Sequence, residues 1–214
     1  LTFLDLYTHP NPAKWEGGLN MLFPAGSKVH KVKHQEAATQ VELSIICKKF
    51  ITSQFVSHQA IVFGILTAAR VNEFLGARWS EIDFDNAVWN CPRRKDGKTE
   101  PHRVPLPTQL MRMLKLMERR SDFIFPSSVN AKSHLCKETP KNILRKNLMR
   151  HVTMHGCRST FRDWCAENGI DRILAEKALM HQTGNAVELA YQRSDLLEQR
   201  RPVMQAWADF LLKS

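Results

Sequence analysis

Residues 82–89, with the sequence IDFDNAVW, decide the fold class. Apolar residues stand on both sides of Asp85-Asn86, a pair typical of hairpin turns, so two short antiparallel strands are expected here. Residues 102–106, HRVPL, predict a third strand. Pro105 confines that strand to an edge, because proline cannot donate to a ladder of hydrogen bonds. The sequence therefore predicts one small antiparallel sheet.

Outside this stretch the apolar spacing is helical. Ala37, Val41 and Ile45 recur every four residues, which predicts a helix from Glu36 with these side chains on one face. Further helices are expected over residues 57–69, 108–120, 139–149, 155–168, 171–180 and 186–191, with Thr108, Thr139 and Asp171 as N-caps and Gly169 as a stop signal. Ser194 is expected to cap a last helix, which carries the apolar side chains Leu197, Val203, Met204, Trp207, Phe210 and Leu211. The predicted fold class is mainly α with a small antiparallel β-sheet (α+β).

The first 35 residues differ in composition from the rest of the chain. Prolines and glycines interrupt them, and lysines follow from Lys28 onward. Such a composition is typical of a linker that lies on a folded body. We expect residues 1–35 to form an interdomain linker and residues 36–214 to fold as one domain.

Charge is the strongest global signal in these 214 residues. Lys and Arg number 31 against 21 Asp and Glu, a net charge of +10, and residues 93–150 alone hold fifteen basic and five acidic residues. A basic block of this density favours a polyanionic partner, usually nucleic acid, over a basic surface that meets only water. The hydrophobic share of 43% excludes wholesale disorder.

Cysteine content and hydropathy indicate the kind of compartment in which the protein works. The chain has five cysteines, an odd number, and no CxxC pair, which excludes a disulfide framework and a zinc finger and favours a reducing compartment. Most of these cysteines are expected to be small buried hydrophobes. The longest apolar run, residues 60–69, is too short to span a bilayer, so no membrane partner is expected.

Two arginines are candidates for binding an anion. In His155-Gly156-Cys157-Arg158, the spacing of three places the imidazole and the guanidinium on one face of a helix, a pair suited to a phosphodiester. A buried histidine beside a surface arginine is the simpler interpretation of that pattern. Arg70 ends an unusually apolar helix, where Glu73 would have to pair with it. That buried ion pair alone is the simpler interpretation of Arg70.

Tyr191 is one of only two tyrosines and follows His181 by ten residues. A phenol has a pKa of about 10, so as a nucleophile it would need nearby cations or a base. Taken alone, a tyrosine in an amphipathic helix is more simply explained by core packing.

The order Arg70, HxxR at 155–158, His181 and Tyr191 resembles the catalytic domain of the tyrosine recombinases (phage-type integrases), and is most similar to prophage and genomic-island integrases. Each block resembles a block of that family. The blocks are NPAKWEGGL (11–19), LTAARVNEFLGARWSEIDFDNAVW (66–89), HGCRSTFRDWCAENG (155–169) and ALMHQTGNAVELAYQRSDLLEQRRPVMQAWADFL (178–211). The resemblance covers nearly the whole chain.

The resemblance implies a role for each of these side chains. Tyr191 would attack the scissile phosphate of DNA and form a 3′-phosphotyrosine, while Arg70 and Arg158 hold the non-bridging oxygens. His155 would assist proton transfer and His181 would hydrogen-bond the phosphate. The supporting residue that braces Arg70 would be Glu73.

The turn between the second and third strands carries the remaining predicted residues. In the family a lysine on this turn protonates the leaving 5′-oxygen, and Lys95 is the preferred candidate because it precedes Gly97, with Lys98 as the alternative. Arg93, Arg94, Lys98 and Arg103 are expected to contact the DNA backbone.

The resemblance also implies partners. They are double-stranded DNA attachment sites and an accessory directionality factor, in the bacterial cytoplasm. The full-length protein would form a homotetramer on DNA, whereas the fragment by itself would be monomeric. Core-binding and arm-binding domains would precede this chain. No cofactor and no metal are expected, since Asp83-Phe84-Asp85 is interpreted as turn chemistry.

Two other functions share much of this chemistry. A type IB topoisomerase uses a tyrosine, two arginines, a lysine and a histidine to relax supercoils without exchanging strands between partners. A non-catalytic DNA-binding remnant of a prophage is the alternative from a different class.

Overall fold

The computed structural model describes residues 37–92, 102–181 and 194–213, and before them residues 11, 14, 16 and 19–22. The chain divides into two units, residues 1–34 and 35–214. The only helix described in the first unit is the short α1 (Asn20–Leu22). Within the described residues, no helix is long and apolar enough to cross a membrane.

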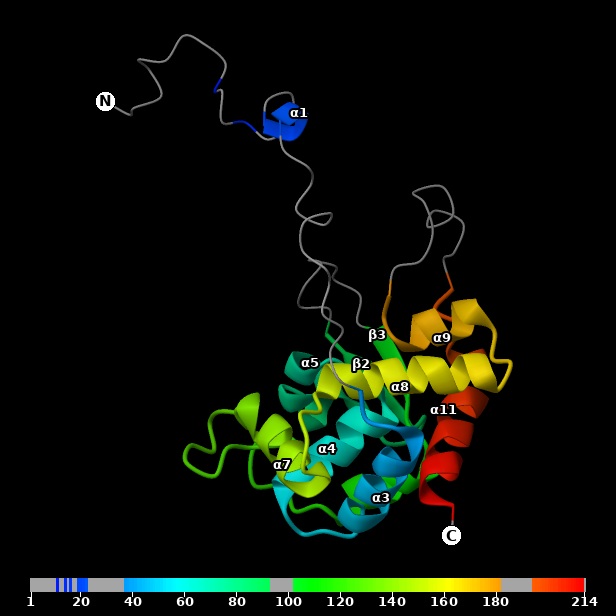
Figure 1. Ribbon diagram of the computed structural model, residues 1–214. Coiled ribbons are helices and arrows are strands. Elements are labelled where there is room, and N and C mark those ends of the chain that lie inside the picture. Colours follow the sequence, from blue (N-terminus) through cyan, green and yellow to red (C-terminus); the bar gives the residue numbers. More distant parts are fainter. Residues whose placement is uncertain are drawn as a thin grey trace. The chain divides into compact units, whose positions relative to one another are not determined.

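The second unit is a helical body with one small sheet, as the sequence predicts (Figure 1). Its helices are α3 (Gln40–Phe50), α4 (Val56–Leu66), α5 (Val71–Leu75), α6 (Thr108–Leu116), α7 (Glu138–Leu148), α8 (Met154–Glu167), α9 (Arg172–Ala178) and α11 (Leu197–Leu212). The helix expected at 186–191 lies outside the described residues.

The sheet has the expected antiparallel order. Strands β1 (Ile82–Asp83), β2 (Val88–Cys91) and β3 (His102–Pro105) lie in the order β1-β2-β3, with Trp89 opposite Ile82 on one side and opposite Val104 on the other. Asp83 Oδ1 accepts the backbone N–H groups of Asp85 and Asn86 at 3.1 and 2.9 Å, which closes the hairpin turn. The DxD sequence thus serves the turn, as predicted.

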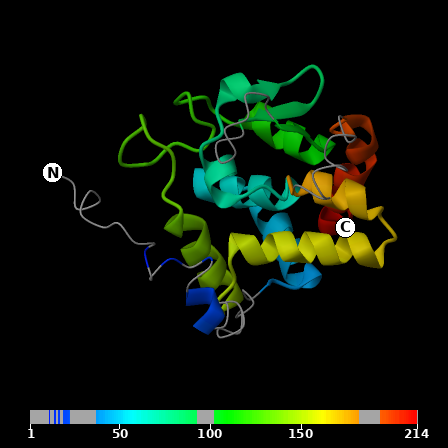
Figure 2. The same cartoon turned by 90° about the horizontal axis from the view of Figure 1, so that it is seen from above.

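Helix α4 forms the centre of the core. It packs against α3, α5, α6, α7, α8 and α11, and seven of its eleven residues are buried. Seen from above, α8 lies on one side of α4, and the sheet and α6 lie on the other (Figure 2). A Cβ at Gly64 would stand 2.6 Å from the Phe74 ring and 2.7 Å from Met154, so the glycine allows α5 and the start of α8 to approach α4 closely.

Helix α11 packs on the same body. Its Trp207 is fully buried, donates its indole N–H to the Ile65 carbonyl at 3.0 Å, and lies 5.1 Å from the Trp164 ring centroid. Most of the apolar side predicted for this helix is buried, although Phe210 is 42% exposed. Four of the five cysteines are buried, as expected, and Cys136 is exposed.

The helix expected from Glu36 begins at Gln40, and the face that Val41 and Ile45 share is exposed. Val41 and Ile45 are 69% and 57% exposed, while α3 buries Leu43, Ile46, Cys47 and Phe50. Both sets recur at helical spacing, so the choice between them falls to packing against α4 and α11.

Helix ends follow the sequence signals in part. Gly169 has φ +67° after α8, and the Asp171 carboxylate accepts the N–H groups of Ile173 and Leu174 at the start of α9, both as predicted. The predicted caps Thr108, Thr139 and Ser194 are wrong, because the N-cap residues of those helices are Pro107, Lys137 and Leu196. The helix expected over 57–69 ends at Leu66.

Candidate active site

Arg158 is the buried centre of the candidate site. It lies in the second turn of α8, which begins after the N-cap Thr153, whose hydroxyl accepts the Gly156 N–H at 3.0 Å. Arg158 is only 5% exposed, the reverse of the simpler interpretation of HxxR. Its guanidinium donates to the Ala68 carbonyl and, at 2.7 Å, to the Leu179 carbonyl.

The two carbonyls that hold Arg158 lie just after helices α4 and α9, and each of these helix ends contains a residue with positive φ. Ala68 follows α4 with φ +48°, and Met180 follows α9 with φ +54°. At the end of α9 the His181 N–H donates to Glu176 O at 2.9 Å and the Met180 N–H to Lys177 O at 3.2 Å, which is a Schellman motif with methionine in place of glycine. The carbonyls of Leu179 and Met180 are therefore free to face the arginines.

Arg70 lies beside Arg158, on a different element. It is the N-cap of α5, and not the end of the preceding helix as predicted; its side chain is 39% exposed. The Glu73 carboxylate accepts the Arg70 backbone N–H at 3.0 Å and the guanidinium at 3.2 Å, so the ion pair expected from the sequence is present. The other end of the guanidinium donates to Met180 O at 3.4 Å.

His181 completes the cluster, immediately after the Schellman turn. Its Nε2 lies 3.2 Å from an Arg158 nitrogen, and its Nδ1 lies 2.6 Å from the Glu176 carboxylate. Glu176 is 6% exposed and also pairs with Arg162 at 3.5 Å. Sequence reasoning missed Glu176, since its spacing of five residues from His181 is not the helical spacing of three or four.

The electrostatics reflect this concentration of cations. Burial, and next the charge of Arg70, lowers the pKa of Arg158 to about 10, so it stays charged at neutral pH. Burial is also the main cause that lowers the pKa of His181, with Arg158 and Arg70 acting in the same direction and Glu176 opposing them. An anion bound at this cluster would offset the repulsion among these groups.

The structure thus brings together Arg70, Glu73, Arg158 and His181 from three separate segments. His155 is exposed and lies on α8 one turn before Arg158, with the spacing predicted. The remaining predicted site residues lie outside the described residues; these are Tyr191, Lys95, Lys98, Arg93 and Arg94.

Arg103, predicted to contact DNA, takes part in a second network. Its guanidinium makes two hydrogen bonds of 2.8 Å to the Asp195 carboxylate. Arg200, which is fully buried, donates to the carbonyls of Asp195 and Arg103, each at 2.8 Å. The network joins β3 to the start of α11, at the points where the chain re-enters the described body after residues 93–101 and 182–193.

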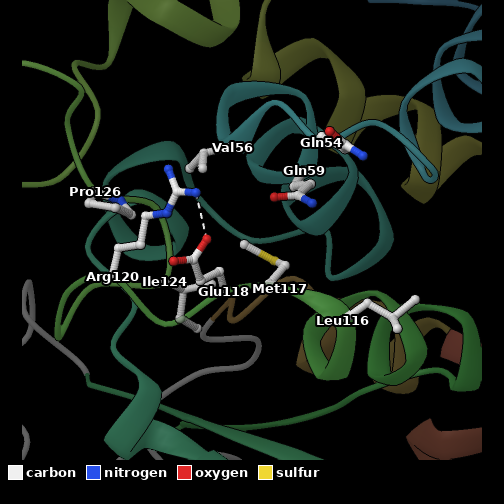
Figure 3. Close-up of a pocket in the computed structure, with 9 residues that line it drawn as sticks. All are labelled: Gln54, Val56, Gln59, Leu116, Met117, Glu118, Arg120, Ile124 and Pro126. Atoms are coloured by element: carbon white, nitrogen blue, oxygen red, sulfur yellow. Dashed lines mark hydrogen bonds and ion pairs between the residues drawn. The ribbon is translucent and has the colours of Figure 1, made fainter.

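A separate pocket of about 280 Å³ lies near the start of α4 (Figure 3). Gln54, Val56 and Gln59 line one side of it, and the Glu118–Arg120 ion pair belongs to its lining. The Arg158 cluster adjoins the other end of α4, whose eleven residues rise about 16 Å. The pocket therefore contains none of the predicted site residues.

The fold resembles those of solved integrases. An integrase from mycobacterium phage Brujita matches with a TM-score of 0.62 at 16% identity, over 82% of this chain and 59% of that one. A lambda integrase dimer bound to a COC′ core site matches with a TM-score of 0.52 at 18% identity, over 77% of this chain and 50% of that one.

The sequence comparisons identify the family. The model of the phage integrase family matches residues 38–197, and the chain belongs to this family of tyrosine recombinases. The prophage integrase IntA of Escherichia coli K12 is 37% identical over 69% of this chain and 37% of its own length. The integrase of Enterobacteria phage P4 is 32% identical over 71% of this chain and 39% of its own length. The chain thus spans less than half the length of these curated relatives.

Proposed function

We propose that the protein containing this chain carries out site-specific DNA recombination, cutting and rejoining DNA through a 3′-phosphotyrosine at Tyr191. The observation that carries the proposal is the convergence of Arg70, Arg158 and His181 around backbone carbonyls, in a chain of the phage integrase family. Such a group of preorganised donors suits the negative charge that builds on a phosphodiester under attack.

In the proposed cleavage step, one bond to phosphorus forms and another breaks. The Tyr191 phenolic oxygen forms a bond to phosphorus, and the bond from phosphorus to the 5′-oxygen breaks. His155 accepts the phenolic proton, and Lys95, or Lys98 as the alternative, gives a proton to the leaving 5′-oxygen. Arg70, Arg158 and His181 hold the non-bridging oxygens. Reversal by a 5′-hydroxyl rejoins the strand without ATP, because the phosphotyrosine conserves the bond energy.

The same proposal covers the setting. The partners are two double-stranded attachment sites and, for the full-length protein, three further copies on the DNA and an accessory directionality factor, in the bacterial cytoplasm. Residues 36–214 are the catalytic domain and residues 1–35 the linker to core-binding and arm-binding domains. The excess of basic residues in 93–150, among them Arg93, Arg94 and Arg103, supports contact with the DNA backbone.

The decisive test uses Tyr191→Phe in the full-length protein. The substrate is a nicked DNA duplex with the sequence found where the mobile element that encodes the protein joins the bacterial chromosome. Wild type is expected to form a covalent DNA adduct, and Tyr191→Phe to form none while still binding the duplex. Undiminished adduct in the variant would remove Tyr191 from the mechanism.

A second assay separates recombination from topoisomerase activity. Wild type is incubated with two DNA molecules that carry attachment sites, one of them supercoiled. Recombinant product supports the proposal, whereas relaxed circles without recombinants would indicate a type IB topoisomerase. Binding with neither product nor adduct would indicate a non-catalytic remnant.

A further inference from the structure

The imidazole of His181 is held between groups of opposite charge. On one side Nδ1 lies 2.6 Å from the Glu176 carboxylate, and on the other side Nε2 lies 3.2 Å from an Arg158 nitrogen. A guanidinium has only donors, so Nε2 must be the acceptor in that contact. The proton of the neutral ring is then on Nδ1, donated to Glu176.

We propose that Glu176 is a positioning residue for His181, which fixes the neutral ring as the Nδ1–H form, directs Nε2 to the phosphate site and stabilises the imidazolium when a phosphate binds. The proposal rests on the proposed function for its phosphate. It assigns Glu176 no contact with DNA.

The backbone and the side chain of Glu176 both bind His181. The Glu176 carbonyl accepts the His181 N–H at 2.9 Å in the Schellman turn, and the carboxylate accepts the Nδ1 proton. The backbone bond fixes the position of the His181 backbone, and the contacts at Nδ1 and Nε2 fix the orientation of its ring. The second carboxylate oxygen faces Arg162 at 3.5 Å, one turn of α8 beyond Arg158, which anchors the carboxylate on the same helix as the phosphate-binding arginine.

The charges around His181 explain why the carboxylate matters. Arg70 precedes α5, Glu73 lies on α5, Arg158 and Arg162 lie on α8, and Glu176 lies on α9. Burial, Arg158 and Arg70 lower the pKa of His181, and Glu176 raises it. A phosphate would neutralise the two arginines and so raise the pKa, which lets Nε2 take up a proton and donate it to a phosphate oxygen. Without Glu176 the imidazolium would be half-buried beside two arginines, with no carboxylate hydrogen-bonded to it.

The first experiment needs no variant of Glu176. In the 214-residue chain labelled with ¹⁵N-histidine, the His181 nitrogens are assigned by their loss in His181→Gln, and their shifts are followed with pH. Above its pKa, His181 is expected to be the Nδ1–H form. A predominant Nε2–H form would overturn the proposal.

The second experiment removes the charge with Glu176→Gln. The pKa of His181 is expected to fall below that of wild type. The neutral ring should become a mixture of the Nδ1–H and Nε2–H tautomers, because an amide can either donate or accept a hydrogen bond. Glu176→Asp keeps the negative charge, so the pKa of His181 in this variant should lie close to its value in wild type. Glu42→Gln is the matched control, since it removes the carboxylate of another partly buried ion pair, with Arg150, and should leave His181 unchanged.

The cleavage assay supplies the functional readout. Glu176→Gln is expected to lower the rate at neutral pH on the order of tenfold, the loss typical when the carboxylate that orients a metal-binding histidine is removed. The alkaline limb of its pH profile should move to lower pH, and move back in Glu176→Asp. An unchanged pKa, tautomer and profile in folded Glu176→Gln would reduce Glu176 to a structural ion pair.

The two proposals can fail separately. The nuclear magnetic resonance measurements require no DNA cleavage, so an inactive wild type with the expected tautomer would refute the proposed function and retain the role of Glu176. An active wild type whose His181 is the Nε2–H form would support the proposed function and refute the role of Glu176.

Discussion

Arg158 is charged and nearly buried, yet among the described residues its hydrogen bonds go to backbone carbonyls and to His181, and no carboxylate lies within ion-pair distance of it. A buried charge is usually stabilised by an opposite charge, because dipoles recover only part of its hydration. Burial has accordingly lowered the pKa of Arg158 to about 10. Its positive charge is therefore held in place and still available to an anion.

This geometry predicts the effect of Arg158→Lys. A lysine keeps the charge but lacks the planar fork, so it cannot hold the carbonyls of Ala68 and Leu179 and also bind phosphate. Cleavage of the attachment duplex is expected to fall about 10²-fold or more. The free energy of unfolding should fall by about 1–3 kcal/mol, since a buried carbonyl loses its donor.

Rates of covalent adduct formation and urea unfolding curves measure the two effects. Arg172→Lys is the matched control, because Arg172 is exposed at the start of α9. A variant that cleaves at nearly the wild-type rate would exclude Arg158 as a direct ligand of the phosphate.

The sequence predicts which residues form the site better than it predicts the groups that those residues contact. Arg70 and Glu73 are three residues apart, so their ion pair follows from the sequence. The partners of Arg158 could not be predicted, because backbone carbonyls have no sequence signal and two of the turns that expose them place Ala68 and Met180 at positive φ, where glycine is the usual residue.

At the scale of elements, the position of the site depends on how closely three helices meet at Gly64. This residue faces Phe74 of α5 and Met154 of α8, and α5 and α8 carry Arg70 at its N-cap and Arg158. The packing at one glycine of α4 thus sets the spacing of the two arginine-bearing elements.

We expect Gly64→Ala to destabilise the protein. Alanine favours a helix over glycine by about 1 kcal/mol. The new Cβ would stand within 2.9 Å of two atoms of the buried Phe74 ring, and such overpacking costs about 1–3 kcal/mol. The net loss should be measurable as a lower urea midpoint with an unchanged m-value. Gly169→Ala is the control for backbone strain alone, because a Cβ at Gly169 would contact nothing within 4 Å. A raised midpoint in Gly64→Ala would show that the helices move apart at little cost.

Helix α3 shows where sequence periodicity stops being informative. Val41 and Ile45 form one apolar row, and Leu43, Ile46 and Cys47 form another. The second row is buried because α4 and α11 pack on it, with Ser44 donating to the Leu211 carbonyl 167 residues away at 2.7 Å. Contacts at that sequence separation are not encoded in local spacing, whereas the Gly169 and Asp171 signals are local and were predicted.

At the scale of the whole molecule, the fifteen basic residues in 93–150 overstate the number of cations that are free to meet DNA. Fifteen basic residues lie in 93–150, but Arg103, Arg120, Lys141 and Arg150 form ion pairs with Asp195, Glu118, Glu138 and Glu42. Each cation that is already paired releases fewer counterions when DNA binds.

Salt dependence of DNA binding measures this difference. We expect the logarithm of the association constant to fall linearly with the logarithm of salt concentration, because phosphate contacts release condensed counterions. If all fifteen cations contacted phosphates the slope would be about −13.5, and we expect a smaller magnitude because four of those in the described residues are paired. Fluorescence anisotropy with a labelled duplex at several salt concentrations gives the slope. Tyr191→Phe should leave it unchanged, since a phenol carries no charge at neutral pH, and a flat plot would contradict a surface that tracks the DNA backbone.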